Sequence, residues 1–197
     1  MGWISSGRIV RFASFAIPVG AVFIDCVADL AQIVGRSMQP LFNPEPSGWL
    51  DVVLLNRTVT FDYKQIKRGD VIAFISPKDP SERLIKRVIA LQGDAVLPRK
   101  GTNVVRIPPG HCWVEGDNHK TSLDSNTFGP VAMGLMVAKA THIVWPPQRI
   151  AAIESRLPPG RGPVSKHLCL QCFSEEESRL LGVQHNPDDH DTSDIFV

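Results

Sequence analysis

The sequence predicts a mainly β domain that follows a single N-terminal apolar helix. From residue 49 onward, short blocks rich in Val, Ile and Leu alternate with turns rich in Gly, Pro and Asp. Almost no segment there repeats apolar residues at a helical period, and this pattern is typical of strands. A long apolar run comes before these blocks, and the composition turns polar after them. The length of 197 residues and the hydrophobic content of 43% fit one domain with a core and appended segments.

The apolar run predicts a membrane anchor over residues 12–34. Residues 12–24 are almost entirely apolar, but a spanning helix needs roughly 20 residues, so the helix is expected to extend further. The extension includes Asp25 and Asp29, which would share one helical face and are costly in lipid unless that face meets protein or water. Residues 1–11 form a short basic segment without an acid, which would keep the N-terminus on the side of synthesis. A buried core helix or a cleaved presequence is the alternative.

The apolar blocks after this run predict the strands of a domain over residues 35–152. Turn sequences such as Gly-Asp and Pro-Pro-Gly separate the blocks, and several short sheets are expected. Residues 153–197 are expected to be a flexible polar tail outside the core, because they combine Pro-rich, acidic and polar stretches. The expected strands cover residues 50–56, 71–75, 84–90, 104–107, 112–115 and 135–145.

Charge and cysteine content exclude several classes of function. The 21 basic and 20 acidic residues give a net charge of +1, so no electrostatic footprint for nucleic acid is present and no nucleic-acid partner is expected. The four cysteines are too few and too scattered for a disulfide framework. Cys169 and Cys172 beside His167 are similar to half of a zinc site, but the second pair of ligands is missing. Neither a metal nor a cofactor is expected, and no phosphate-binding Gly loop is found.

Ser37 and Lys86 are the candidate catalytic pair. Ser37 lies in a turn-prone segment, residues 35–40, and Lys86 lies in an apolar, strand-like block. A serine hydroxyl is a poor nucleophile until a neighbouring base takes its proton, and a lysine becomes that base when desolvation lowers its pKa from about 10.4 towards neutrality. Strand alternation gives Lys86 and Arg87 equally apolar neighbours, but an arginine stays protonated. Each residue alone has a plain structural explanation, so the combination carries the prediction.

A serine hydrolase with a histidine base is an alternative site. Such a site needs a histidine that an acid orients, and His119 lies near Asp117 in the sequence. The Gly-x-Ser-x-Gly elbow of many such hydrolases is missing from the chain, which favours the lysine base.

The order of the motifs resembles the type I signal peptidase family (S26). The resemblance covers about residues 12–152 and is strongest to the mitochondrial inner-membrane members of that family. The motifs are Ser-Met-x-Pro at 37–40, Lys-Arg-Val at 86–88, Gly-Asp-Asn at 116–118, Ser-x-Asp-Ser at 122–125 and Phe-Gly at 128–129.

The resemblance implies a Ser/Lys dyad in a signal-peptidase-like antiparallel β-sheet domain with one N-terminal transmembrane helix. Ser37 would be the nucleophile and Lys86 the general base of a membrane-bound serine endopeptidase. Ser122 would hydrogen-bond the amine of Lys86, and Asp124 would brace the loop around it. For these two residues the alternative is a Ser/Asp loop that caps its own backbone.

The resemblance also implies a substrate class, a compartment and a partner. The enzyme would remove sorting or signal peptides from proteins delivered to the mitochondrial intermembrane space. It would be a single-pass protein of the mitochondrial inner membrane, with its catalytic domain facing that space. The implied partners are substrates that carry a sorting peptide and a paralogous peptidase subunit in a heteromeric complex.

Two positions depart from the family pattern. Gly35 replaces a serine whose hydroxyl helps many members bind the oxyanion, so backbone amides, including that of Ser37, are expected to form the oxyanion hole. Asn126 replaces a frequent arginine, which puts the rigidity of its loop in doubt. These departures keep open a catalytically silent subunit that stabilises a partner peptidase. A secretory-type signal peptidase in another compartment also stays open. A self-cleaving regulator of the related β fold would need a DNA-reading helical module, which the sequence lacks.

Overall fold

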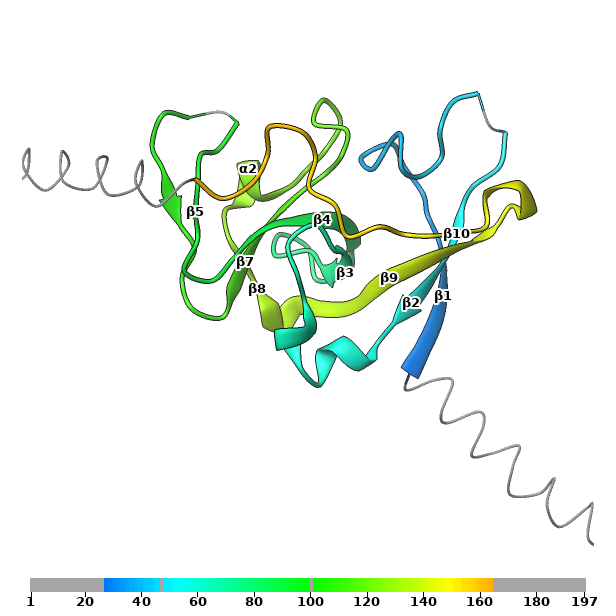
Figure 1. Ribbon diagram of the computed structural model, residues 1–197, viewed down its shortest axis with the longest axis horizontal. Coiled ribbons are helices and arrows are strands. Elements are labelled where there is room, and N and C mark those ends of the chain that lie inside the picture. The colour runs from blue at the N-terminus through cyan, green and yellow to red at the C-terminus, as the bar shows by residue number, and fades with distance from the viewer. Residues whose placement is uncertain (1–26, 47, 100, 165–197) are drawn as a thin grey trace, which may run out of the picture. The chain divides into compact units, whose positions relative to one another are not determined.

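An antiparallel sheet of eight strands dominates the computed structural model, which describes residues 27–46, 48–99 and 101–164 (Figure 1). The strands run in the order β1-β2-β9-β3-β4-β7-β8, and β10 pairs with β9. Two further strands, β5 and β6, form a separate two-stranded sheet. The prediction of a mainly antiparallel β fold is confirmed, but one large sheet replaces the several short sheets that were expected.

Eight of the ten described strands are two to five residues long, whereas β4 and β9 are longer, and 3-10 turns separate several of them. The strands are β1 Ala28–Gln32, β2 Val52–Asn56, β3 Val71–Ile75, β4 Arg83–Leu91, β5 Ala95–Val96, β6 Val105–Arg106, β7 His111–Glu115, β8 Val131–Ala132, β9 Met136–Trp145 and β10 Ala151–Ala152. The helical segments are η1 Thr58–Thr60, η2 Tyr63–Gln65, α2 Ser125–Phe128, η3 Met133–Leu135 and η4 Pro147–Arg149.

The six predicted strands all form, and their ends agree with the observed ends to within two residues. They correspond to β2, β3, β4, β6, β7 and β9, in which alternation and turn residues are strong. The strands that sequence reasoning missed are β1, β5, β8 and β10. Three of these contain only two residues each, too few to produce a recognisable period. β6 is equally short, and it was predicted from the longer apolar block over residues 104–107.

Strand β1 corrects the predicted anchor. Its backbone pairs antiparallel with β2, so the helix expected over residues 12–34 does not include Ala28–Gln32. Asp29, expected on the anchor helix, lies in this strand, where Oδ1 accepts a hydrogen bond from Leu30 N at 2.8 Å. The predicted helix was extended to residue 34 only because a membrane span needs about 20 residues. Pairing with β2 instead satisfies the backbone N–H and C=O groups of Ala28–Gln32. Residues 12–26 lie outside the described residues, and in the described part of the chain no helix is long and apolar enough to cross a membrane.

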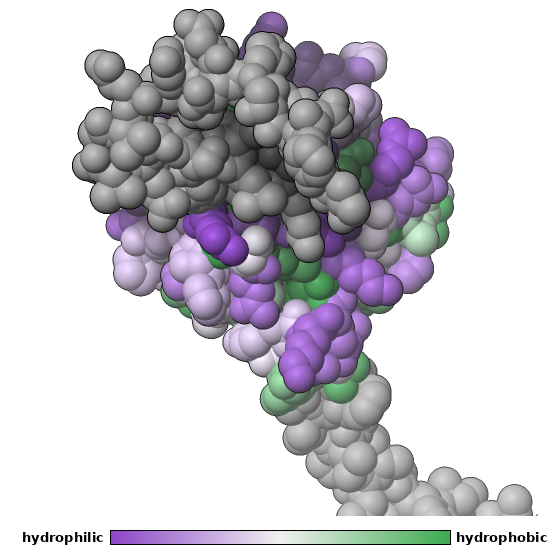
Figure 2. Space-filling model, turned by 60° about the vertical axis from the view of Figure 1, so that its left-hand side comes forward, coloured by the Kyte–Doolittle hydropathy of each residue, from purple (hydrophilic) through white to green (hydrophobic). Residues whose placement is uncertain are grey.

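Apolar side chains pack into three clusters along the sheet. One joins β2, β3 and β9 to the turn that follows β1, and it buries Met38 and Phe42 at 1% and 0% exposure. A second lies between β3, β4 and β7 around Phe74, and the third surrounds Trp113 beside the two-stranded sheet. On the face drawn in Figure 2 the described surface is mostly hydrophilic, with hydrophobic residues in a smaller area. Because Met38 is buried, the turn that carries Ser37 is fixed to the core.

The segment that follows β10, residues 153–163, is here called the strap, and it belongs to the domain. In Figure 1 it runs, yellow to orange, from β10 back towards β5. Ile153 packs against the first cluster, and its N–H donates to the carbonyl of Thr141 at 2.8 Å. Leu157 packs against the third cluster. The expected tail boundary at residue 153 is therefore wrong, because a polar composition hid these two apolar anchors; residues 165–197 lie outside the described residues.

Candidate active site

Ser37 and Lys86, the two predicted catalytic residues, lie against each other. The Nζ atom of Lys86 and the Oγ atom of Ser37 are 2.8 Å apart, although 49 positions separate them in the sequence. Ser37 comes from the turn between β1 and β2, and Lys86 comes from the middle of β4, opposite Ile72 of β3. A neutral lysine at this distance accepts the hydroxyl proton, which is the geometry that a general base requires.

Burial favours the neutral form of the Lys86 amine. The residue is 2% exposed, and this desolvation lowers the pKa of Lys86, whereas the carboxylates of Asp124 and Glu82 act in the opposite direction. Among the described residues, no carboxylate lies within ion-pair distance of Nζ. The amine therefore loses hydration without gaining a direct counter-ion, and this favours its neutral, basic form.

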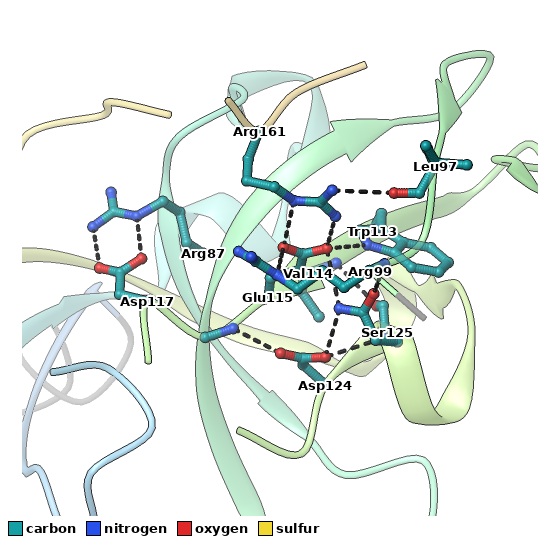
Figure 3. Close-up of polar contacts among 12 residues, drawn as sticks. Arg87, Leu97, Arg99, Trp113, Val114, Glu115, Asp117, Asp124, Ser125 and Arg161 are labelled. Atoms are coloured by element: carbon teal, nitrogen blue, oxygen red, sulfur yellow. Dashed lines mark hydrogen bonds and ion pairs between the residues drawn. The ribbon is translucent and has the colours of Figure 1, made fainter. Parts of the chain in front are cut away.

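Arg87, which strand alternation could not separate from Lys86, has a different role. Its Nε and Nη2 atoms donate to the two carboxylate oxygens of Asp117 at 2.8 and 2.7 Å (Figure 3). Its Nη1 atom donates to the carbonyl of Gly69 at 2.8 Å. Because Asp117 is bound in this way and His119 is exposed, the structure does not form the His–Asp arrangement of the alternative hydrolase site.

The two residues before Ser37 are Gly35, whose backbone conformation favours glycine, and Arg36, whose side chain forms a surface ion pair. Gly35 has a φ of 99°, a conformation in which a residue with a side chain would be strained, so the local backbone favours glycine there. Arg36 pairs with Glu45 at 3.2 Å. Both side chains are largely exposed, so this pair contributes little to stability. The carbonyl of Ser37 accepts a hydrogen bond from Asn118 N at 3.0 Å.

Asn43, which sequence reasoning missed, closes the same turn. Its N–H donates to Oδ2 of Asp51 at 2.8 Å, and its Oδ1 accepts from Asp51 N at 2.8 Å. Its Nδ2 donates to the carbonyl of Ile33 at 2.8 Å. Asp51 is fully buried and lies 3.1 Å from Nε of Arg149. Asn43 has a left-handed φ of 49°, which asparagine tolerates, and the Asn-Pro dipeptide was the available sequence signal.

The two predicted support residues, Ser122 and Asp124, differ in the contacts that they make. Asp124 accepts from Gly116 N at 3.0 Å and, as the cap of α2, from Asn126 N at 3.1 Å, so it braces the loop as expected. The Oγ atom of Ser122 is buried and has no hydrogen-bond partner among the described residues. The expected hydrogen bond from Ser122 to Lys86 is therefore not formed. Ser122 instead lies against Gly116, where an added Cβ would meet its side chain.

Asn126 does not leave its loop without side-chain support. Its Nδ2 donates to Oδ1 of Asp124 at 3.0 Å and to Oε1 of Glu115 at 3.1 Å. Its Oδ1 accepts from Arg99 N at 2.7 Å. The amide therefore bridges two carboxylates by hydrogen bonds, although the sequence put the rigidity of this loop in doubt.

A groove of about 560 Å³ opens at the Ser37–Lys86 pair. One side is lined by β1 and the turn after it, and another by the first half of β4. Leu123 contributes an apolar side chain, and Glu82 and Arg83 contribute charges of opposite sign. The nucleophile candidate is thus accessible to a chain that lies along the groove.

Metal ligation has no support in the described part of the molecule. No group of three or more His, Cys, Asp or Glu side chains is placed there so as to hold an ion. The half-site at Cys169 and Cys172 lies outside the described residues.

Comparison with known proteins identifies the family. The sequence profile described as "Signal peptidase, peptidase S26" matches residues 6–105 and 97–145, which together span more than half of the chain. The chain belongs to this signal peptidase family. The family that the motif order indicated is thereby confirmed.

Several relatives of this signal peptidase family member are mitochondrial proteins. Mitochondrial inner membrane protease subunit 2 of Mus musculus is 51% identical over 150 residues, which cover 76% of this chain and 85% of that protein. Subunit 2 of Saccharomyces cerevisiae is 39% identical over 176 residues, with coverage of 85% and 97%. Subunit 1 of Mus musculus is 32% identical over 147 residues, with coverage of 71% and 85%.

Proposed function

We propose that this protein is a serine endopeptidase that uses Ser37 and Lys86 to remove sorting peptides from membrane-tethered proteins. The contact of 2.8 Å between the Ser37 hydroxyl and a buried lysine amine, at the wall of a groove, carries this proposal. Burying a lysine amine costs free energy unless the amine is hydrogen-bonded or paired with a charge. A turn serine and a strand lysine with purely structural roles would leave the amine free to reach solvent.

The geometry supports an acyl-transfer mechanism. Neutral Lys86 takes the proton of the Ser37 hydroxyl while Oγ attacks the scissile carbonyl carbon, and backbone amides, including that of Ser37, stabilise the resulting oxyanion. Protonated Lys86 then gives this proton to the leaving amine, and an acyl ester on Ser37 remains. Water attacks the ester with Lys86 again as base, which releases the product acid and restores the hydroxyl.

The shape of the groove favours an extended substrate. A peptide lying along it would have β1, an edge strand of the sheet within the described residues, on one side and β4 on the other. Backbone hydrogen bonds to a strand edge give affinity with little dependence on sequence, and small side chains next to the scissile bond would fit shallow pockets. Such recognition suits sorting peptides, which differ in sequence.

The relatives support a compartment and a partner. We place the protein in the mitochondrial inner membrane as a single-pass protein, with the catalytic domain facing the intermembrane space. The resemblance to mouse subunits 1 and 2 supports a complex with a paralogous peptidase subunit.

The test is cleavage of a tethered sorting-peptide substrate by the full-length protein in its membrane, with the partner present. We expect Ser37→Ala and Lys86→Ala each to abolish cleavage at unchanged protein and partner levels. Lys120→Ala removes a lysine from an exposed loop position and is expected to leave cleavage unchanged. If both site variants process the substrate at the wild-type rate, the chain is a structural subunit and the proposal is wrong.

A further inference from the structure

Four consecutive residues, 115–118, connect the strap to the candidate active site. Two of them, Glu115 and Asp117, direct their carboxylates to arginines that lie in the strap or against it. The other two, Gly116 and Asn118, donate backbone hydrogen bonds towards the Ser37–Lys86 pair, to Asp124 and to Ser37. The segment therefore receives contacts from the strap and makes contacts to the site at alternate residues.

The first strap contact is an ion pair between Arg161, which is half-buried, and the buried carboxylate of Glu115. Nε of Arg161 donates to Oε2 of Glu115 at 2.9 Å, Nη2 of Arg161 pairs with Oε1, and Nη1 donates to the carbonyl of Leu97 at 3.1 Å (Figure 3). Glu115 is 1% exposed and also accepts from Trp113 Nε1 at 2.9 Å. Burial alone would raise the pKa of Glu115, but the hydrogen bonds and charge of Arg161, together with Trp113 and Asn126, lower it overall.

The second strap contact is made through the backbone. Nη1 of Arg87 donates to the strap carbonyls of Glu154 at 3.3 Å and Arg156 at 3.1 Å, while the rest of its guanidinium is bound to Asp117. Gly69 lies so close to this part of the strap that an added Cβ would be 2.7 Å from Arg156 N. The strap is thus packed closely over the arginine that follows Lys86.

The other two residues of the segment reach the site directly. Gly116 N donates to Oδ2 of Asp124 at 3.0 Å, and Asp124 is the carboxylate that acts most strongly on Lys86. Asn118 N donates to the carbonyl of Ser37 at 3.0 Å. A shift of this segment would therefore move the nucleophile turn and the charge that faces the base at the same time.

We propose that the strap positions the Ser37–Lys86 pair. Arg161, near the C-terminal end of the strap, is the positioning residue. Arg161 touches neither member of the pair and acts through Glu115. Without its guanidinium, Glu115 remains a buried carboxylate with Arg99, 3.1 Å away, as its remaining cationic partner. Glu115 keeps Trp113 Nε1 and Asn126 Nδ2 as donors to Oε1 but loses both hydrogen bonds of the guanidinium. The carboxylate then draws in water or shifts to replace them, and the backbone of residues 115–118 shifts with it. The effect on cleavage rests on the proposed function, whereas the effect on the segment does not.

The experiment compares Arg161→Gln with Arg156→Gln in the full-length, membrane-embedded protein with its partner. Arg156 lies in the same strap, but its side chain is exposed, so its substitution removes the same charge without the buried pair. We expect Arg161→Gln to lower kcat about tenfold or more with KM changed less than about twofold, because a shift of about 1 Å at a reacting group costs about a hundredfold. Arg161→Lys keeps the charge but loses the bidentate geometry, and its kcat is expected to fall in between. Arg156→Gln is expected to match wild type.

A second readout does not depend on cleavage. Hydrogen exchange at the amides of Gly116 and Asn118 is expected to become faster in Arg161→Gln, while exchange in β2 and β9 stays at the wild-type rate. Unchanged exchange in the segment, faster exchange throughout the sheet, or equal effects of Arg156→Gln would overturn the proposal. If wild type and Ser37→Ala both fail to cleave, the proposed function is wrong, and the exchange data still decide the role of Arg161.

Discussion

Gly116 lies against the turn that carries Ser37, so a single methyl group added there tests how tightly the candidate site is packed. A Cβ at this position would lie 2.6 Å from Cβ of Ser122, and the carbonyl oxygen of Ser37 and Oγ of Ser122 would be closer still. Ordinary van der Waals contact begins near 3.4 Å, so both neighbours would have to move by nearly an ångström. The carbonyl of Ser37 is part of the backbone, so the Ser37 hydroxyl moves with it.

The magnitude of the effect follows from that displacement. Overpacking of this kind costs about 1–3 kcal/mol of folding stability. A displacement of about 1 Å at the reacting groups costs about a hundredfold in rate. We therefore expect Gly116→Ala to lower kcat about a hundredfold while the protein still folds.

The assay is cleavage of the tethered substrate at matched protein levels, together with thermal unfolding of the same samples. Gly134→Ala is the matched control, because an added Cβ there has no neighbour within 4 Å. If Gly116→Ala cleaves and unfolds like wild type, the packing of this loop against Ser37 does not hold the nucleophile in place and the reasoning is refuted.

Two further predictions concern the base and the turn. Since only a neutral amine accepts the Ser37 proton, kcat/KM should rise with pH through the pKa of Lys86, which burial places below the ordinary value of about 10.4. Glu82→Gln removes a carboxylate that raises this pKa, so the midpoint of the pH–rate profile should move to lower pH; a midpoint that stays or rises contradicts the assignment. Asn43→Gly loses the hydrogen bonds of the side chain but tolerates the φ of 49°, so we expect it to lose about 1–3 kcal/mol in denaturant unfolding. Asn43→Ala should lose more because its backbone is also strained, and equal losses would show that the conformation of the turn is unimportant.

Strand positions could be predicted from the sequence because they depend on local pattern. The blocks that became β3 and β4 alternate with clear turn residues, and strand existence follows from such signals. Ala28–Gln32 could not be assigned in this way, since its apolar and small residues also fit the end of a helix. Its extended state is decided by pairing with β2, which begins about twenty positions later in the chain.

The candidate site was predicted only as far as residue chemistry reaches. Ser37 and Lys86 could be named as candidates because a nucleophile and a base are recognisable by residue type, and Asp124 because its loop follows a motif. Ser122 was assigned to Lys86 by resemblance, and the observed packing against Gly116 gives it no such hydrogen bond. Asn43 was missed because its partners lie at both ends of its own turn.

The sequence by itself determined which residues could perform the chemistry, which segments would be extended and to which family the chain belongs. Only the tertiary structure decided that Lys86 rather than Arg87 faces Ser37, because both have apolar neighbours along β4 and only the packing of the sheet gives each side a different partner. It also decided that the strap is part of the domain. Arg161 and Glu115 are 46 positions apart, and a polar segment is ordered when its charges find buried partners, which composition does not record.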